Sequence, residues 1–228
     1  VAPSRGLGDV YKRQSVCDVT AAPTLIQKCK DAGNVPIIFF NKEITDYDVI
    51  NSYENAYQVT STGGDYGASI QAQMVIDYWK EHPEMDKNGD GKLQLVYLMG
   101  DPGHTASQPR CDYLKSTIED AGIEIDLLAE DTGMWVTATA KEKMDAWVSK
   151  YGDEIECCVA GNDAMALGAL SAVEAAGFNT DGEESSKYMP IYGIDALPEI
   201  LSKIESGEIT GSVLQDAKTC LLYTSDAA

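Results

Sequence analysis

The residues best suited to chemistry lie in one acidic loop, residues 86–94, with the sequence DKNGDGKLQ. Side chains that carry an oxygen stand at positions 1, 3, 5 and 9 of this loop, which are Asp86, Asn88, Asp90 and Gln94. Gly91 at position 6 permits a tight turn, and Lys92 at position 7 can ligate through its backbone carbonyl. Because calcium takes several oxygen ligands in a flexible cage, this spacing predicts a calcium site, whereas magnesium fits it worse.

The loop is not a complete EF-hand. Position 12, where that motif has a bidentate glutamate, is Tyr97, and the loop leads into an expected strand instead of a second helix. A calcium site here therefore needs a carboxylate from elsewhere in the chain. The alternative is a plain turn, which Asp, Asn and Gly favour in any case.

A second group of polar residues follows the expected strands. Apolar runs without alternation predict strands, each covered by helices on both faces, at 35–40, 93–100, 155–160, 189–194 and 209–214. Further strands are expected at 56–60 and 123–128. Helices are expected at 21–33, 63–82, 111–121, 141–150, 162–176 and 197–205. This order predicts an α/β fold with doubly wound parallel sheets. Ligands in such sheets bind at the carboxyl ends of strands, a rule that points to Asn41, residues 100–104, Asn162, Asp195 and Gln215.

Composition excludes several classes of protein. The 228 residues carry a formal net charge of −20, which disfavours binding to nucleic acid. No run of about 18 apolar residues occurs, so no membrane span is expected. The two histidines, His82 and His104, have no serine or cysteine partner in a recognisable motif, and neither a P-loop nor a GxGxxG motif is present. We therefore do not expect an enzyme.

The six cysteines form no CxxC pair, so zinc or thioredoxin-like chemistry is not expected. Cys157 and Cys158 lie in the apolar run IECCVA and are interpreted as small buried thiols.

The two ends of the chain differ from the rest. Residues 1–14 and 220–228 fit neither helix nor strand periodicity, and they are similar to translated sequencing-adapter reads. We expect both to be sequencing artefacts and leave them out of the fold prediction. No signal segment is visible, which is uninformative if the gene was cut at both ends.

Six motifs occur in a consistent order between about residues 19 and 218: VPIIFFNKE, DKNGDGKLQ, GDPGH, MW followed by AKEKMDAW, AGNDAMALGA and GIDALPE. In content and order they resemble the bacterial D-galactose/D-glucose-binding proteins, periplasmic proteins with the two-lobed type I periplasmic-binding fold. The resemblance implies part of an N-terminal lobe at 15–61, a C-terminal lobe with the calcium loop at 62–214, and a return to the first lobe at 215–219. The N-terminal lobe is expected to be incomplete, and hinges are expected near 61–62 and 215.

The resemblance also implies the site residues. Glu156 matches the family glutamate that completes the calcium site. Seven residues match the sugar site: Asn41, His104, Arg110, Trp135, Asn162, Asp195 and Gln215. In this site an aromatic ring covers the apolar face of a pyranose, and planar polar groups meet its hydroxyls. Two positions depart from the family, since Ala106 replaces an aspartate and Gln215 replaces an asparagine.

Taken singly, these residues have plainer explanations. Trp135 could be a core aromatic, His104 a turn residue, Asn162 and Asp163 N-cap residues of a helix, and Asp195 a loop acid. Their common position after strands or in loops favours the binding interpretation.

By resemblance, the protein captures a monosaccharide outside the cytoplasm, either in the periplasm or as a membrane-anchored lipoprotein. It is expected to be a monomer that delivers the sugar to the membrane permease of an ABC importer, with a chemoreceptor as a further partner. The alternative is the effector-sensing domain of a LacI-type transcriptional repressor, which shares the fold. Such a repressor needs a basic helix-turn-helix upstream, and the acidic charge and calcium loop argue against it.

Overall fold

The computed structural model describes residues 12–16, 18–59, 64–183 and 185–216. The chain divides into two compact units: unit 1 comprises Val1–Ser61 with Asp216–Ala228, and unit 2 comprises Thr62–Gln215. The boundaries predicted from the sequence lie after residues 61 and 214. Most of the two predicted artefact segments, residues 1–11 and 220–228, lies outside the described residues.

Unit 1 contains a three-stranded parallel sheet in the order β1-β2-β3. Its strands are β1 (Lys12–Gln14), β2 (Ile37–Phe40) and β3 (Ala56–Val59). Its helices are η1 (Val19–Ala21), α1 (Ala22–Asp31) and α2 (Tyr47–Asn51). The core of this unit includes Ile26, Ile37 and Phe39, all of them buried.

Strand β1 corrects one expectation, because we predicted no strand within residues 1–14. Lys12–Gln14 pairs in parallel with residues 37–39, and the Lys12 amide donates to the Pro36 carbonyl over 2.7 Å. Pairing at the edge of a sheet uses main-chain groups, so it does not require the side-chain periodicity on which the prediction depended. Whether residues 1–14 are a sequencing artefact stays a prediction.

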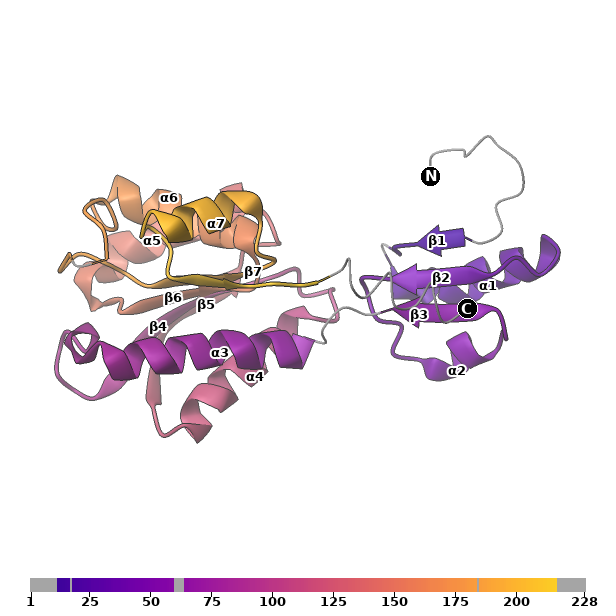
Figure 1. Cartoon of the computed structure of the whole chain (residues 1–228), viewed down its shortest axis with the longest axis horizontal. Helices are drawn as coiled ribbons and strands as arrows, with labels where there is room; N and C mark the ends of the chain where they lie inside the picture. Colours follow the sequence, from indigo (N-terminus) through magenta and orange to yellow (C-terminus); the bar gives the residue numbers. More distant parts are fainter. Residues whose placement is uncertain (1–11, 17, 60–63, 184, 217–228) are drawn as a thin grey trace. The chain divides into compact units, whose positions relative to one another are not determined.

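Unit 2 is built on a five-stranded parallel sheet in the order β5-β4-β6-β7-β8. The strands are β4 (Lys92–Met99), β5 (Glu124–Thr132), β6 (Cys157–Ala160), β7 (Ile191–Ile194) and β8 (Gly211–Val213). The helices are α3 (Gly64–Glu81), η2 (Pro83–Met85), α4 (Ser107–Asp120), α5 (Thr137–Tyr151), η3 (Gly152–Glu154), α6 (Asp163–Ala175) and α7 (Pro198–Glu205). Helices α3 and α4 cover one face of the sheet, and α5, α6 and α7 cover the other (Figure 1). The predicted α/β fold is confirmed.

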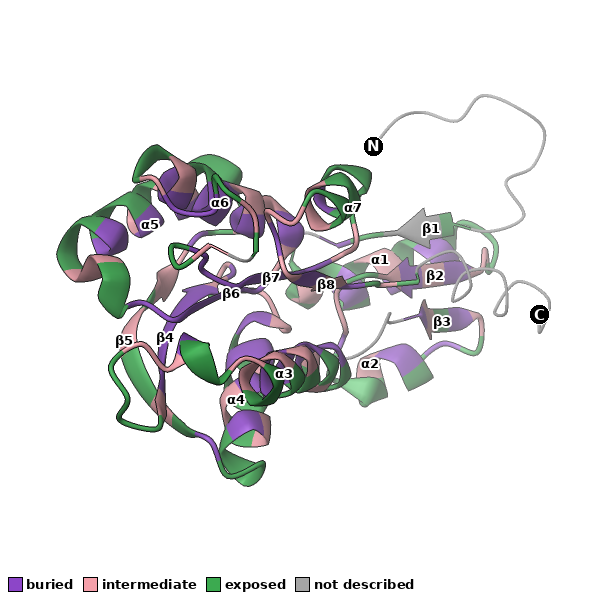
Figure 2. Ribbon diagram, turned by 60° about the vertical axis from the view of Figure 1, so that its left-hand side comes forward, coloured by how far each residue is buried: buried purple, intermediate pink, exposed green. Residues whose placement is uncertain are grey.

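The strands inside the sheet of unit 2 are apolar on both faces because both faces are covered (Figure 2). In β4, Leu95 and Tyr97 belong to the core under α3 and α4. Val96 and Leu98 belong to the core under α5 and α6. All four residues of β6 and of β7 are buried as well. The absence of alternation in the sequence therefore has the predicted cause.

One further prediction is confirmed in unit 2. Cys157 and Cys158 are buried, and burial raises the pKa of the Cys158 thiol to about 12, so the thiol stays protonated and unreactive. No helix within the described ranges is long and apolar enough to cross a membrane.

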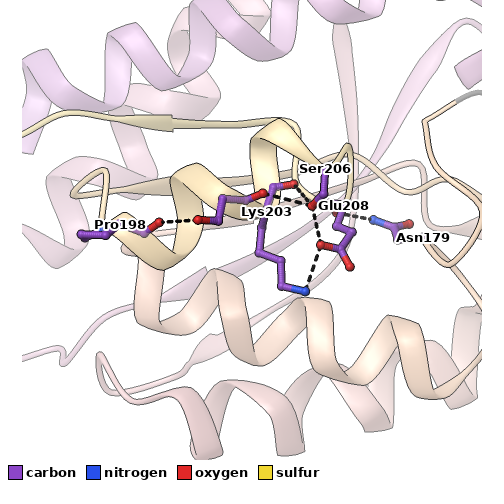
Figure 3. Close-up of polar contacts among 6 residues, drawn as sticks. Asn179, Pro198, Lys203, Ser206 and Glu208 are labelled. Carbon is purple, nitrogen blue, oxygen red and sulfur yellow. Dashed lines mark hydrogen bonds and ion pairs between the residues drawn. The ribbon is translucent and has the colours of Figure 1, made fainter.

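Hydrogen bonds around Glu208 close the end of α7 (Figure 3). The Glu208 carboxylate accepts from the Ser206 hydroxyl at 2.6 Å and pairs with Lys203 at 2.9 Å. The Glu208 carbonyl accepts from Asn179 Nδ2 at 3.1 Å. Asn179, which is 1% exposed, also exchanges two bonds with the Met189 main chain, so it joins the segments before β7 and β8.

Substitution of Asn179 tests this junction. Asn179→Ala leaves the amide of Met189 and the carbonyls of Met189 and Glu208 without their partner, and it puts alanine at a φ of 51°. We expect the free energy of unfolding of unit 2 to fall by about 3 kcal/mol, measured by urea denaturation. Ser206→Ala, which removes an exposed hydroxyl, should stay within about 0.5 kcal/mol of the unsubstituted chain. Equal effects of the two substitutions would contradict this role for Asn179.

Candidate functional site

Trp135 lies in the turn that follows β5, at the carboxyl edge of the sheet. Met134 and Trp135 have φ values of 55° and 62°, a left-handed conformation that is rare for side chains of this size. Four hydrogen bonds hold the turn. Gly133 N–H donates to the Met99 carbonyl at 2.7 Å, Val136 N–H to the Gly133 carbonyl at 2.9 Å, the Thr132 hydroxyl to the Gly100 carbonyl at 2.6 Å, and Met134 N–H to the Thr132 hydroxyl oxygen at 3.1 Å. The strain is therefore compensated by bonds to the end of β4.

Two glycines form the seat of the Trp135 ring. A Cβ atom added at Gly100 would lie 2.0 Å from the ring, and one added at Gly161 would lie 3.2 Å from it. Gly100 follows β4 and Gly161 follows β6, so the ring lies against two strand ends. Sequence reasoning passed over Gly161 and singled out Gly100 only as part of the segment 100–104. The available signal was a glycine directly after the strand in both GDPGH and AGND.

Arg110 and His104 contact the same indole ring. The Arg110 guanidinium carbon lies 5.5 Å from the ring centroid, and the His104 ring meets Trp135 edge-on at a centroid distance of 5.3 Å. Arg110 Nη1 donates to the Gly161 carbonyl, and His104 Nδ1 accepts from the Ala106 amide at 3.1 Å. The structure thus brings together Trp135, Arg110 and His104, which come from three separate loops and helices.

Arg110 is 7% exposed, and burial lowers the pKa of its guanidinium. The charge of Asp195 opposes this shift. Burial raises the pKa of Asp195, and the Gln215 hydrogen bond and the charge of Arg110 oppose that rise. Each of the two charges therefore favours the ionised form of the other. Arg110 Nε and Trp135 Nε1 are buried donors without a hydrogen-bond partner among the described residues.

Asp195 and Gln215 are joined directly, because Gln215 Nε2 donates to Asp195 Oδ1. The longer amide side chain at 215 therefore reaches the carboxylate that the sequence placed in the same site. Asp195 itself has a φ of 131°, and its amide donates to the Val213 carbonyl at 2.8 Å.

Asn162 serves as the N-cap of α6, where its Oδ1 accepts from the Met165 amide at 3.0 Å. The interpretation of Asn162 as an N-cap residue is therefore correct, and its Oδ1 is used for the cap. Asn162 nevertheless directly follows Gly161, which contacts the Trp135 ring and accepts from Arg110.

Asn41 belongs to unit 1. It is exposed, directly follows β2, and has a φ of 75°. Asparagine tolerates this left-handed conformation better than most residues.

The acidic loop and Glu156 meet at the opposite, amino-terminal edge of the sheet. Glu156 is 1% exposed; its Oε1 accepts from the Lys87 amide at 2.7 Å and its Oε2 from the Gln94 amide at 3.0 Å. Burial raises the pKa of Glu156, and the neighbouring charge of Asp86 raises it further. Glu156, the carboxylate predicted to complete the acidic loop, is therefore hydrogen-bonded to the main chain of that loop.

Within the loop, side-chain oxygens accept from successive amides. Asp86 accepts from Gly89 at 2.8 Å and from Gly91 at 2.9 Å, and Asp90 accepts from Lys92 at 2.8 Å. These are the bonds of a tight turn, as the alternative explanation requires. Gln94 differs, because its Nε2 donates to Asp90 while its Oε1 is buried and has no partner among the described residues.

An orphaned buried oxygen at position 9 fits a cation held by this loop. The acidic side chains would not suffice alone, since no group of three or more His, Cys, Asp or Glu in the described part of the chain could hold a metal ion. The remaining ligands would have to be the amide oxygens of Asn88 and Gln94 and the Lys92 carbonyl.

A family model described as "Periplasmic binding protein domain" matches residues 14–220, most of the chain. The chain belongs to this family. The loops after β4, β5 and β6, which surround Trp135, therefore belong to a periplasmic binding protein domain.

Several known proteins are similar to this chain in sequence or in fold. The chain is 43% identical over 204 residues to the D-galactose/methyl-galactoside binding periplasmic protein MglB of Haemophilus influenzae, covering 89% of this chain and 58% of that protein. It is 32% identical over 152 residues to a xylitol-binding protein of Mycolicibacterium smegmatis, covering 67% and 41%. An ABC transporter solute-binding protein from Bacillus halodurans with bound myo-inositol superposes with a TM-score of 0.74 at 26% identity, covering 95% of this chain and 68% of that one. The chain thus spans little more than half the length of its galactose-binding relative.

The glycine seat of Trp135 can be tested with matched substitutions in one loop. Gly100→Ala places a methyl group inside the indole ring, so the ring must move, and the free energy of unfolding should fall by about 2 kcal/mol. Gly103→Ala is the control, because its added Cβ would make only ordinary contact, at 3.4 Å from Asp101 Oδ1. We expect the Trp135 indole N–H resonance to shift in Gly100→Ala and to stay in place in Gly103→Ala. An unchanged resonance in both would contradict the seat.

Proposed function

We propose that the protein is an extracytoplasmic solute-binding protein that captures a monosaccharide of the glucose/galactose type and delivers it to an ABC sugar importer. The observation that carries the proposal is the cluster at the carboxyl edge of the unit 2 sheet. There an indole ring lies beside a guanidinium and an imidazole, with Asp195 and Gln215 hydrogen-bonded nearby.

This combination of groups suits a pyranose. The ring offers an apolar face, and the guanidinium, carboxylate and amide offer donors and acceptors for hydroxyl groups. Such groups favour a sugar over an apolar ligand, because a ligand without hydroxyls would leave them unpaired. The galactose-binding relative supports this class of ligand.

The relatives also bear on the alternatives. They are solute-binding proteins by name, which favours transport over the effector domain of a LacI-type repressor, and no catalytic step is proposed. Membership of the family implies a periplasmic location. A chemoreceptor partner, a lipid anchor and a monomeric state stay predictions of the sequence.

Sugar titration tests the proposal. We expect D-glucose or D-galactose to bind the 228-residue chain with measurable heat in calorimetry, and Trp135→Ala to weaken binding at least about tenfold, because it removes the stacking surface. Tyr113→Ala, which removes an exposed aromatic of α4, should leave the affinity unchanged. Absence of binding to D-glucose, D-galactose and methyl-galactoside at millimolar concentration would overturn the proposal.

We further propose that residues 86–94 bind a structural calcium ion together with Glu156. The support is the buried, partnerless Oε1 of Gln94 and the contact of the Glu156 carboxylate with both ends of the loop. The ligands would be Asp86, Asn88, Asp90, Lys92 through its carbonyl, Gln94 and Glu156. Because no three acidic side chains of the described residues are arranged to hold a metal ion, a bound cation would have to draw the carboxylates of Asp86, Asp90 and Glu156 together, which would tie the start of β4 to the start of β6.

Calcium removal tests this second proposal. At about 100 times the dissociation constant, calcium should stabilise the folded state by about 2.7 kcal/mol, which raises the melting temperature by several degrees over that in EGTA. Glu156→Gln should abolish the difference between calcium and EGTA, whereas Glu154→Gln, an exposed neighbour, should retain it. The same melting temperature in calcium and EGTA for the unsubstituted chain would contradict the proposal.

A further inference from the structure

Asp163 is the first residue of α6 and is completely buried, with an exposure of 0%. Its Oδ2 accepts from the Leu197 amide at 2.7 Å, and its Oδ1 accepts from the Ser212 hydroxyl at 2.6 Å. The Ser212 oxygen in turn accepts from the Ala196 amide at 3.1 Å. The carboxylate and the hydroxyl together therefore hold two consecutive amides of the loop after β7.

That loop begins with the strained residue of the candidate sugar site. Asp195 has a φ of 131° and Ala196 a φ of 52°, both in the left-handed region. A non-glycine residue persists there only when its surroundings over-determine it. The amides of Ala196 and Leu197 are the next two donors along the chain, and both are held through Asp163.

Capping of α6 does not account for Asp163, because Asn162 already caps that helix. The Asp163 side-chain bonds run to the loop after β7 and to β8. Room for the carboxylate comes from Gly193, since a Cβ atom there would lie 2.2 Å from Asp163 Oδ1. Glycine in β7, serine in β8 and aspartate in α6 thus form one arrangement directed at residues 195–197.

We propose that Asp163 is a positioning residue: by holding the amides of Ala196 and Leu197 it keeps Asp195 and Ala196 at positive φ and so directs the Asp195 carboxylate toward Gln215. Its consequence for ligand binding rests on the proposed function. Asp163 itself does not contact the sugar in this scheme.

A double-mutant cycle separates positioning from a general structural role. Asp195→Asn should weaken sugar binding at least tenfold in the otherwise unsubstituted chain. In a chain that already carries Asp163→Asn, the same change should weaken binding less than threefold, because the carboxylate is already misdirected. Additive effects of the two substitutions would overturn the proposal. Glu199→Gln, an exposed acid in the first turn of α7, is the control and should be additive with Asp195→Asn.

A second measurement needs no sugar. In the unsubstituted chain the amides of Ala196 and Leu197 should exchange slowly with solvent, and the three-bond couplings of Asp195 and Ala196 should report positive φ. In Asp163→Asn both amides should exchange at least tenfold faster, and the couplings should change. Unchanged exchange and couplings would overturn the proposal whatever the sugar result.

The outcomes distinguish the two proposals. If the unsubstituted chain binds no sugar, the proposed function fails, and amide exchange alone decides the role of Asp163. If it binds sugar and the cycle is additive, only the role of Asp163 fails. Should Asp163→Asn not fold, Ser212→Ala serves instead: it should accelerate exchange at Ala196 while Leu197 stays protected, and equal protection of both would overturn the proposal.

Discussion

Strand β4 lies inside the sheet of unit 2, between β5 and β6, and packs apolar side chains against helices on both faces. Such a strand has no solvent side, so the chain must supply helices to both faces, and each crossover returns to the same edge of the sheet. Because the strands are parallel, the loops of unit 2 that carry candidate sugar-binding groups all follow strand ends at that edge. The edge where the strands end collects the loops after β4, β5, β6, β7 and β8.

Close approach of side chains to the backbone characterises this edge. The Trp135 ring lies against two glycines, and Asp163 occupies the space over a third, Gly193. Two candidate site residues of this edge, Trp135 and Asp195, have positive φ values although neither is glycine. Strain of this kind costs of the order of 1–3 kcal/mol per residue and concentrates where a fixed geometry serves binding. Here hydrogen bonds to the ends of β4 and β8 hold the two turns in their strained conformation.

Parallel pairing also separates the two proposed sites. The acidic loop and Glu156 precede β4 and β6, whereas the residues around Trp135 follow β4, β5 and β6. The length of the sheet lies between them. A cation at the amino-terminal edge would therefore act on the stability of unit 2, and a sugar at the carboxyl edge would respond mainly to the geometry of the loops there.

By itself the sequence determined the order of strands and helices in unit 2, because uniform apolar runs that alternate with helical periodicity indicate a sheet covered on both faces. It also determined the turn at residues 86–94, whose side-chain oxygens bond amides only a few residues away. β1 escaped prediction because edge pairing uses the main chain alone. Only the tertiary structure decided that Trp135 lies on Gly100 and Gly161, and that Asp163, which the sequence assigned to a helix cap, holds the loop after β7. These contacts join segments far apart in the chain, and they depend on the strand order β5-β4-β6-β7-β8, which local periodicity does not encode.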